Sequence, residues 1–328
     1  MNTNVSVSVI IPVHNGASRI CRCLDALKNQ TIGRDVEIIV VNDGSSDNTA
    51  EVIRMQHPWV RLLNQNNAGP AAARNRGAAE ATGSIIMFTD DDCEPAPEWL
   101  DAMLQPFSDS EVVGTKGAYR TRQPQVMARF VQTEYEDKYR LMARHANIDF
   151  IDTYSAAFRR EKFQEMNGYD TQFPVACAED IELSYRMAAR GWIMKFVPGA
   201  IVYHQHPDSF LGYAKKKFKF AFWRVLAVRK NPQKAIKDTH TPQLMKLQML
   251  FGPALAGCAV LDVILKPAVP ISVVVIAAFM MTCIPFSLRV AKKDPIVGAI
   301  SPGVLAVRSC AQFLGVASGI IGAKPKIV

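Results

Sequence analysis

The first 90 residues alternate between short apolar runs and stretches with helical periodicity, and this pattern constrains the fold more than any other feature. Residues 20–27 carry apolar side chains at the i, i+3, i+4, i+7 spacing of a helix with one buried face. Residues 70–81 form an alanine-rich predicted helix. Strands alternating with helices predict a parallel sheet covered on both faces. The predicted strands are residues 5–11, which stop before Pro12, and residues 36–41, 60–63 and 85–88.

The fourth predicted strand ends in three consecutive carboxylates, Asp90, Asp91 and Asp92. Adjacent carboxylates repel one another, so a buried strand seldom ends in three of them unless a cation or a polar ligand is held there. In open α/β sheets, ligands bind beyond the carboxyl ends of the strands. Asp90 and Asp92 suit a hard divalent ion that holds a diphosphate; the alternative is a solvated acidic turn. No G-x-G-x-x-G follows the first strand, which argues against a dinucleotide-binding domain.

The composition divides the 328-residue chain into a soluble part, residues 1–240, and an apolar part after Gln243. Residues 247–265 contain one charged residue and residues 269–288 contain none, so each run is long enough to cross a bilayer core of roughly 30 Å. Residues 296–322 are also apolar, with Arg308 near their middle. We expect this third stretch either to cross the membrane or to lie along its surface. In either case Arg308 should face another helix or the surface, because its charge is costly inside a bilayer.

Much of the net charge of +8 lies between residues 210 and 240, where lysines and arginines alternate with aromatic residues. Such a segment could bind nucleic acid or anionic lipid headgroups, and the apolar spans that follow favour the membrane surface over nucleic acid. The same basic segment predicts a cytoplasmic location for the first 240 residues and a multi-pass protein of the inner membrane. We see no signal peptide. The seven cysteines form no C-x-x-C pair and fit a reducing compartment.

Seven motifs in unbroken order between about residues 5 and 210 resemble the inverting glycosyltransferases of family 2. The resemblance implies the GT-A fold of nucleotide-diphospho-sugar transferases, with a mixed, mainly parallel sheet followed here by C-terminal transmembrane helices. We therefore expect a catalytic domain at 1–210, a basic interfacial segment at 210–240 and a membrane region at 243–324. The motifs are VSVIIPVHN (7–15), EIIVVNDGSSDNT (37–49), NAGPAAARNRG (67–77), TDDD (89–92), FRREKFQEMNGYD (158–170), AEDIELSYR (178–186) and GWIMKFVPGAIVYH (191–204).

The resemblance also implies a nucleotide and metal site. The loop after the first strand would wrap the nucleobase, Asp43 would accept from a uracil imide N–H, and Arg74 would reach the base or the diphosphate. The ordinary alternatives are a simple turn for the loop, a helix cap for Asp43 and an exposed helix arginine for Arg74. Asp92 would be the main ligand of Mn²⁺ or Mg²⁺, and His204 or its rival His206 a further ligand. The nucleotide-binding residues would be Pro12, Val13, Asn15, Asp43, Arg74, Asp90 and Asp91, although Asp91 is expected to point away from the metal.

An inverting transfer needs a carboxylate that deprotonates the acceptor hydroxyl. By resemblance this base is Asp180; the alternative is an ordinary acidic first turn, favoured by the helix dipole. Glu179, Gly168 and Tyr169 would contact the acceptor.

Processive members of the family carry a Gln-x-x-Arg-Trp motif after this acidic pair, and the chain has none. We therefore expect transfer of one sugar, a hexose-like unit carried on a nucleotide diphosphate, with UDP the expected nucleotide. The apolar spans predict a lipid-linked acceptor, as in the assembly of surface polysaccharides or glycolipids. Two alternatives remain: direct transfer to a polyprenyl phosphate, and a membrane scaffold that keeps the fold without catalysis.

Overall fold

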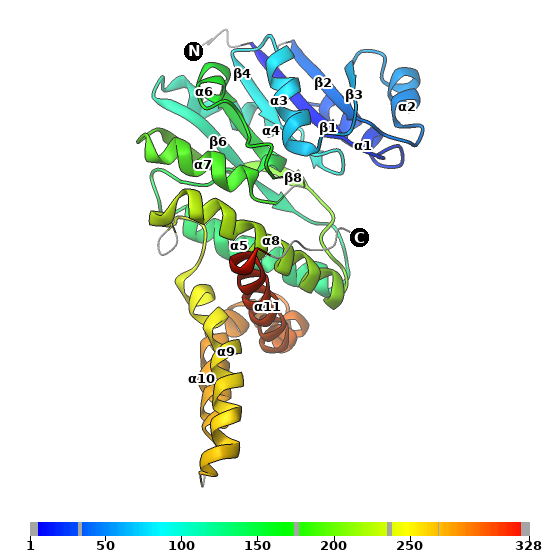
Figure 1. Ribbon diagram of the computed structural model, residues 1–328. Helices are drawn as coiled ribbons and strands as arrows, with labels where there is room; N and C mark the ends of the chain where they lie inside the picture. Colours follow the sequence, from blue (N-terminus) through cyan, green and yellow to red (C-terminus); the bar gives the residue numbers. More distant parts are fainter. Residues whose placement is uncertain (1–5, 32–34, 174–176, 235–237, 268, 323–328) are drawn as a thin grey trace. The chain divides into compact units, whose positions relative to one another are not determined.

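The computed structural model describes residues 6–31, 35–173, 177–234, 238–267 and 269–322 (Figure 1). The chain divides into two compact units. Unit 1 consists of residues 1–122, 139–205 and 230–240, and unit 2 of residues 123–138, 206–229 and 241–328. Residues 123–138 belong to unit 2, although they lie inside the range 1–210 that the sequence predicted as the catalytic domain. The predicted domain boundaries remain predictions.

Unit 1 is built on one eight-stranded sheet with the strand order β3-β2-β1-β4-β7-β6-β8-β5. Parallel pairing joins β1 to β2 and β4, β2 to β3, and β6 to β8, whereas β7 and β5 run antiparallel to their neighbours. The predicted mixed, mainly parallel sheet is confirmed. The strands are β1 (Val7–Val13), β2 (Val36–Asp43), β3 (Arg61–Gln65), β4 (Ile85–Phe88), β5 (Glu94–Pro95), β6 (Val112–Arg120), β7 (Ala156–Arg159) and β8 (Ile193–Tyr203).

Helices cover this sheet, and α3 packs on β1 and β2 at very short range. A Cβ atom on Gly77 would lie 2.4 Å from Ile10 Cγ2, so only glycine lets α3 approach β1 this closely. Every residue of β1 and β4 is buried, as expected for strands covered on both faces. The helices of unit 1 are α1 (Ile20–Lys28), α2 (Thr49–Gln56), α3 (Pro70–Glu80), α4 (Trp99–Leu104), α6 (Arg160–Glu165) and α7 (Glu179–Ala189).

The prediction that the first strand ends at Pro12 is wrong, because β1 continues through Pro12 to Val13. β4 ends at Phe88, opposite Ile10. Beyond Ile10, β1 therefore pairs only with β2, and proline is tolerated there as it is on an edge strand.

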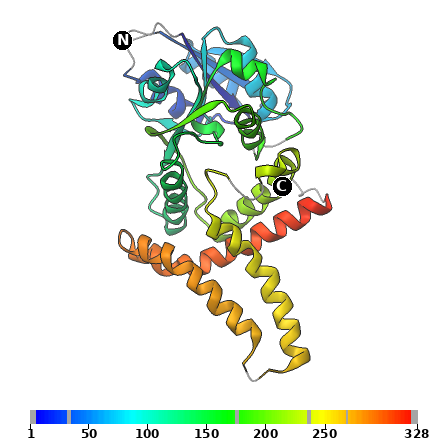
Figure 2. The ribbon, with the colours of Figure 1, turned by 90° about the vertical axis from the view of Figure 1, so that its left-hand side faces the viewer.

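Unit 2 consists of long helices, three of which are long and apolar enough to cross a membrane among the residues described. Figure 2 shows α9 and α10 as an antiparallel hairpin, with α11 running across the base of that hairpin. The helices begin and end within a few residues of the predicted spans. The helices are α5 (Val126–Met142, with its last turn in unit 1), α8 (Phe210–Lys230), α9 (Gln243–Leu265), α10 (Ile271–Ala291) and α11 (Pro295–Ile321).

Candidate active site

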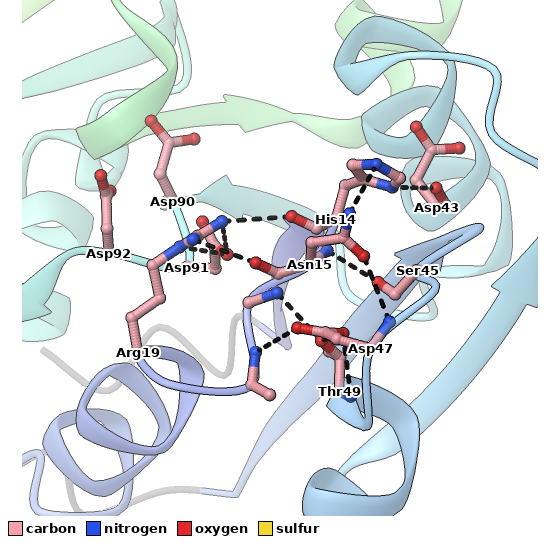
Figure 3. Close-up of polar contacts among 12 residues, drawn as sticks. His14, Asn15, Arg19, Asp43, Ser45, Asp47, Thr49, Asp90, Asp91 and Asp92 are labelled. Atoms are coloured by element: carbon pink, nitrogen blue, oxygen red, sulfur yellow. Dashed lines mark hydrogen bonds and ion pairs between the residues drawn. The ribbon is translucent and has the colours of Figure 1, made fainter.

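The aspartate cluster follows β4, and its three side chains do not point the same way. Asp91 accepts a hydrogen bond from Arg19 Nε at 2.8 Å. The other guanidinium nitrogens of Arg19 donate to the carbonyl oxygens of His14 and Asn15. Burial raises the pKa of the Asp91 carboxyl to about 6, although Arg19 opposes the shift. In Figure 3, Asp91 turns toward Arg19 while Asp90 and Asp92 extend away from it. Asp91 therefore ties the aspartate cluster to the loop after β1, and its predicted contact with nucleotide remains a prediction.

The loop after β1, predicted to surround the nucleobase, is held by the loop after β2 (Figure 3). Asn15 adopts a positive φ of 50°, and its side-chain oxygen accepts from the Ser46 N–H at 2.8 Å. His14 Nδ1 lies 2.8 Å from the carbonyl oxygen of Asp43. His14 and Asn15 are exposed, whereas Pro12 and Val13 are buried in the strand. The exposed pair is thus the part of the loop that a base could contact.

Asp43, at the end of β2, is buried and accepts three hydrogen bonds. They come from the backbone N–H groups of Ala68 and Gly69, at 2.8 and 2.9 Å, and from Gln65 Nε2 at 2.7 Å. These bonds hold the turn that begins α3. An ionised carboxylate has about four acceptor positions, so room remains for one further donor such as a base N–H. Recognition of uracil by Asp43 remains a prediction.

Arg74, on α3, is 2% exposed and joins two parts of the site. Its Nη2 donates to Asp90 at 2.7 Å and its Nη1 to Glu179 at 3.0 Å. Glu179 is also buried, and its second oxygen accepts from the N–H groups of Cys177 and Ala178. The guanidinium thus ties the aspartate cluster after β4 to the acidic pair that begins α7. Contact of Arg74 with a base or diphosphate remains a prediction.

Asp180 is the next residue of α7, and its environment differs sharply from that of Asp92. Burial, reinforced by the negative charge of Glu179, raises the pKa of Asp180 to about 7. Burial acts in the same direction on Asp92, but the hydrogen bond and positive charge of His204 outweigh it and leave the pKa of Asp92 below its usual value. At neutral pH, Asp92 is therefore ionised while Asp180 can exchange a proton.

Asp92, Cys93 and His204 form the one group of potential metal ligands found among the described residues. His204 Nδ1 lies 3.4 Å from Asp92 Oδ1 because β5, which follows Cys93 closely, pairs with the end of β8. Burial raises the pKa of the Cys93 thiol well above its ordinary value. Mn²⁺ and Mg²⁺ prefer oxygen ligands to sulfur, so Cys93 is the poorest ligand of the three. Asp92 and His204 therefore fit a divalent ion such as Mn²⁺ or Mg²⁺. The rival His206 belongs to unit 2, where its Nε2 lies 3.0 Å from Gln132 Oε1.

The residues predicted to contact the acceptor lie mostly in the interior. Glu179 and Tyr169 are 1% and 2% exposed. Gly168 has a φ of +65°, and a Cβ atom there would lie 2.4 Å from Asn75 Oδ1. The Asn75 side chain exchanges hydrogen bonds with the backbone of Tyr169 at 2.7 and 2.8 Å. This turn is therefore fastened to α3, and direct contact with the acceptor remains a prediction.

The sequence alone gave no role to Arg19 or Asn75. Asn75 lies inside a recognised motif, directly after Arg74, whereas Arg19 comes four residues after the end of the first motif at Asn15. Their roles depend on contacts between segments far apart in the chain, which a motif does not contain.

Residues 8–166 match the family described as Glycosyl transferase family 2, and this region of the chain belongs to that family. The uncharacterized glycosyltransferase YibD of Escherichia coli is 41% identical over 107 residues, 32% of this chain and 31% of that protein. The pre-mycofactocin glycosyltransferase of Mycobacterium tuberculosis is 28% identical over 232 residues, 68% of this chain and 48% of that protein. The chain thus spans about a third to a half of the length of these relatives.

Among solved structures, the fold is similar to that of the mannosyltransferase PcManGT from Pyrobaculum calidifontis, in complex with GDP-Man and Mn²⁺. The TM-score is 0.64 at 21% identity, and the match covers 98% of this chain and 88% of that chain. At this identity the likeness concerns the fold. It confirms the predicted GT-A fold, and it extends over nearly all of the chain.

Proposed function

We propose that the protein is an inverting glycosyltransferase that moves one sugar from a nucleotide-diphosphate sugar to a lipid-linked acceptor. We expect the donor to be a UDP-sugar. The observation that carries this proposal is the pair of carboxylates, Asp92 and Asp180, whose pKa values are shifted in opposite directions. Arg74 links their two segments. Opposite pKa shifts at two carboxylates of one site allow chemically equal groups to take different roles.

In the proposed reaction, Asp180 accepts the proton of the acceptor hydroxyl, and the oxygen attacks the anomeric carbon of the donor. The bond from that carbon to the diphosphate breaks on the opposite face, so the configuration inverts. A general base works best when its pKa lies near the operating pH, as that of Asp180 does. A divalent ion held by Asp92 and His204 would stabilise the negative charge of the departing diphosphate. The Mn²⁺ in the structurally similar mannosyltransferase supports a divalent ion.

The membrane region supports a lipid-linked acceptor, since an enzyme acting on a soluble acceptor gains little from hydrophobic anchors. The exposed apolar side chains of α9 and α10, such as Val263 and Met281, at 73% and 67% exposure, suit lipid contact. The basic helix α8 suits the anionic headgroups of a cytoplasmic leaflet. We therefore propose a multi-pass protein of the inner membrane with its catalytic region in the cytoplasm, acting in surface glycan assembly. Direct transfer to a polyprenyl phosphate is the second candidate, and the same membrane helices support it.

The pH dependence of transfer should follow the protonation of Asp180. Below its pKa of about 7 the carboxyl already holds a proton and cannot accept another, so kcat/KM should rise with pH and level off above 7. At pH 6 the rate should be roughly one tenth of the plateau. A pH–rate profile under constant Mn²⁺ checks this result. A profile that is flat between pH 5.5 and 8 would show that Asp180 is not the general base.

Asp92→Asn should keep the fold and weaken metal-dependent nucleotide binding. The substitution replaces a charged oxygen by an amide of nearly equal volume. Even the loss of an outer-shell partner of a metal ligand typically costs roughly 10–100-fold in metal affinity, so at least a tenfold loss is expected.

The measurement is the rise in unfolding temperature of detergent-purified protein with Mn²⁺ and each of a set of nucleotides and nucleotide sugars. Asp25→Asn, an exposed carboxylate on α1, is the matched control and should behave as wild type. Protection of the wild type by one nucleotide sugar also identifies the donor. Equal protection of Asp92→Asn would refute the metal assignment, and protection by none of the nucleotides would refute the proposed activity.

A further inference from the structure

Helix α11 has the length and apolarity of a membrane span, but one of its faces packs against the other helices of unit 2. It is 27 residues long, and Arg308 is its only charged residue. Its buried apolar side chains form a core with side chains of α5 and α10 and with Tyr213 of α8. The buried face of α11 includes Val297, Val304, Leu305, Arg308, Gly315 and Gly319.

Another side of α11 is exposed and apolar over the whole length of the helix. We call it the apolar stripe: Ile296, Ala299, Gly303, Cys310, Leu314 and Ile321. Because an α-helix turns once in about 3.6 residues, these positions lie within about 60° of one another around the helix axis. Leu314 and Ile321 are 55% and 82% exposed. A continuous apolar surface of this length marks a contact with lipid or with another protein.

The neighbours of the apolar stripe favour lipid over a second protein. α11 packs on α9 and α10, and the outward side chains of this hairpin, such as Val263 and Met281, are the exposed ones that we assign to the membrane. Figure 2 shows α11 running across the base of the hairpin, with α8 on its other side. A bilayer that surrounds the hairpin therefore extends up to α11, and its acyl chains would cover the apolar stripe.

The first half of α11 is fastened to α5, a helix rich in charged residues. Asp294, the N-cap residue of α11, accepts from Arg129 Nε at 2.8 Å. Near the middle of α11, Arg308 Nη1 donates to Glu134, also at 2.8 Å, and both side chains are buried. Arg308 therefore faces another helix, as its charge led us to expect. If α11 crossed a bilayer, this part of α5 would have to enter the bilayer with it.

The second half of α11 lies against the basic helix α8. A Cβ atom on Gly315 would lie 2.4 Å from the carbonyl oxygen of Phe218, so the two backbones are in close contact. In the last turn, the carbonyl oxygen of Ile320 accepts from Arg229 Nη2 at 2.7 Å. A crossing α11 would thus bring α8 into the hydrocarbon, where charged side chains are costly. The basic residues of α8 between these two contacts are Lys219 and Arg224.

We propose that α11 does not cross the membrane but lies in the plane of the cytoplasmic leaflet, with the apolar stripe against the acyl chains. This inference rests on the membrane location in the proposed function. Amphipathic helices at a membrane surface bury their apolar face about 5–10 Å deep. Here α5 and α8, instead of water, cover the other face. The chain then crosses the membrane twice, through α9 and α10, and the end of α11 lies on the same side as the catalytic region.

The side on which α11 ends distinguishes two crossings from three. The full chain is expressed in a bacterial host with one of two reporters at its C-terminus: a phosphatase active only outside the cytoplasm, or a green fluorescent protein that fluoresces only inside it. As a control, each reporter is inserted between Lys266 and Pro267, where α9 ends, and the rest of the chain is retained. We expect fluorescence without phosphatase activity at the C-terminus, and phosphatase activity without fluorescence at the insertion.

The two reporter positions separate this inference from the proposed function. Phosphatase activity at the C-terminus would show a third crossing and overturn this inference alone. Fluorescence at the insertion would show that the hairpin does not cross, and it would refute the membrane location in the proposed function.

Two native cysteines report whether the apolar stripe contacts lipid. Cys310 belongs to the stripe, near the middle of α11, and Cys258 lies within α9. Full-length protein in liposomes is spin-labelled, and collisions of each label with oxygen, which enters the bilayer, are compared with those of a water-soluble nickel complex. Cys310→Ser and Cys258→Ser each remove one label and so assign the signals. We expect the label on Cys310 at a depth of about 5–10 Å and the label on Cys258 deeper.

A Cys310 label at the bilayer centre would show that α11 crosses the membrane. A label that collides readily with the nickel complex would place the apolar stripe in water, and one that collides with neither reagent would place it against a second protein. Each of these three results would overturn the inference. A Cys258 label in water would instead refute the membrane location in the proposed function.

Discussion

Asp180→Asn is expected to bind the nucleotide donor as well as wild type and to transfer sugar roughly 10²–10⁴-fold more slowly, the usual contribution of a general base. The asparagine keeps the shape of the side chain and can still accept from the Ile181 N–H, as Asp180 does at 2.7 Å. It cannot take a proton from the acceptor hydroxyl. The substitution also removes a negative charge beside Glu179, so the fold should not be weakened.

Turnover is measured with labelled nucleotide sugar, and donor binding by protection from thermal unfolding. Asp101→Asn, an exposed carboxylate on α4, is the matched control and should retain wild-type turnover. The rise of kcat/KM toward pH 7 should disappear in Asp180→Asn, because the group that titrates is gone. Near wild-type turnover in this variant would show that another group deprotonates the acceptor.

Arg74→Met should destabilise unit 1 strongly, because it leaves Glu179 buried beside Asp90 without the cation that both contact. Removing one partner of a buried ion pair typically costs about 3–5 kcal/mol, since the remaining charge stays desolvated. At about 2–4 °C per kcal/mol for a domain of this size, the unfolding temperature should fall by roughly 6–20 °C.

Arg76→Met, an exposed position two residues along the same helix, is the control and should change the unfolding temperature by only a few degrees. The double variant Arg74→Met with Glu179→Gln should recover part of the loss, because the unpaired charge is then removed. A single variant as stable as wild type would mean that Arg74 does not hold the two acidic segments together.

Much of the fold of unit 1 could be predicted from local pattern. Strand β4 has the predicted bounds, and helix α3 ends one residue before its predicted end. Both could be predicted because apolar runs and helical spacing depend only on residues close together in the sequence. The order of the eight strands could not be obtained this way. It depends on pairings such as β5 with β8, whose residues lie more than a hundred positions apart.

The candidate site shows the same division. The acidic motifs could be recognised individually, but the sequence left His206 as a rival to His204. The structure places His204, just after the end of β8, beside Asp92. From the sequence we expected Arg74 to contact the base or the diphosphate of the donor. In the structure it is buried between the carboxylates of Asp90 and Glu179. The pKa difference between Asp92 and Asp180 also depends on burial and on neighbours from distant segments, which motif spacing does not contain.

One measurement tests the proposed function most directly. Detergent-purified wild type is incubated with Mn²⁺, a lipid extract of the source membranes and the labelled nucleotide sugar that protects it from unfolding. The label is then followed into the organic phase, and the anomeric configuration of the product is determined. We predict that the organic phase gains one sugar per lipid, with a configuration opposite to that of the donor, and that Asp180→Asn yields no more than about a hundredth of this product. Label that remains in water as free sugar, or a lipid product that retains the donor configuration, would contradict the proposed mechanism.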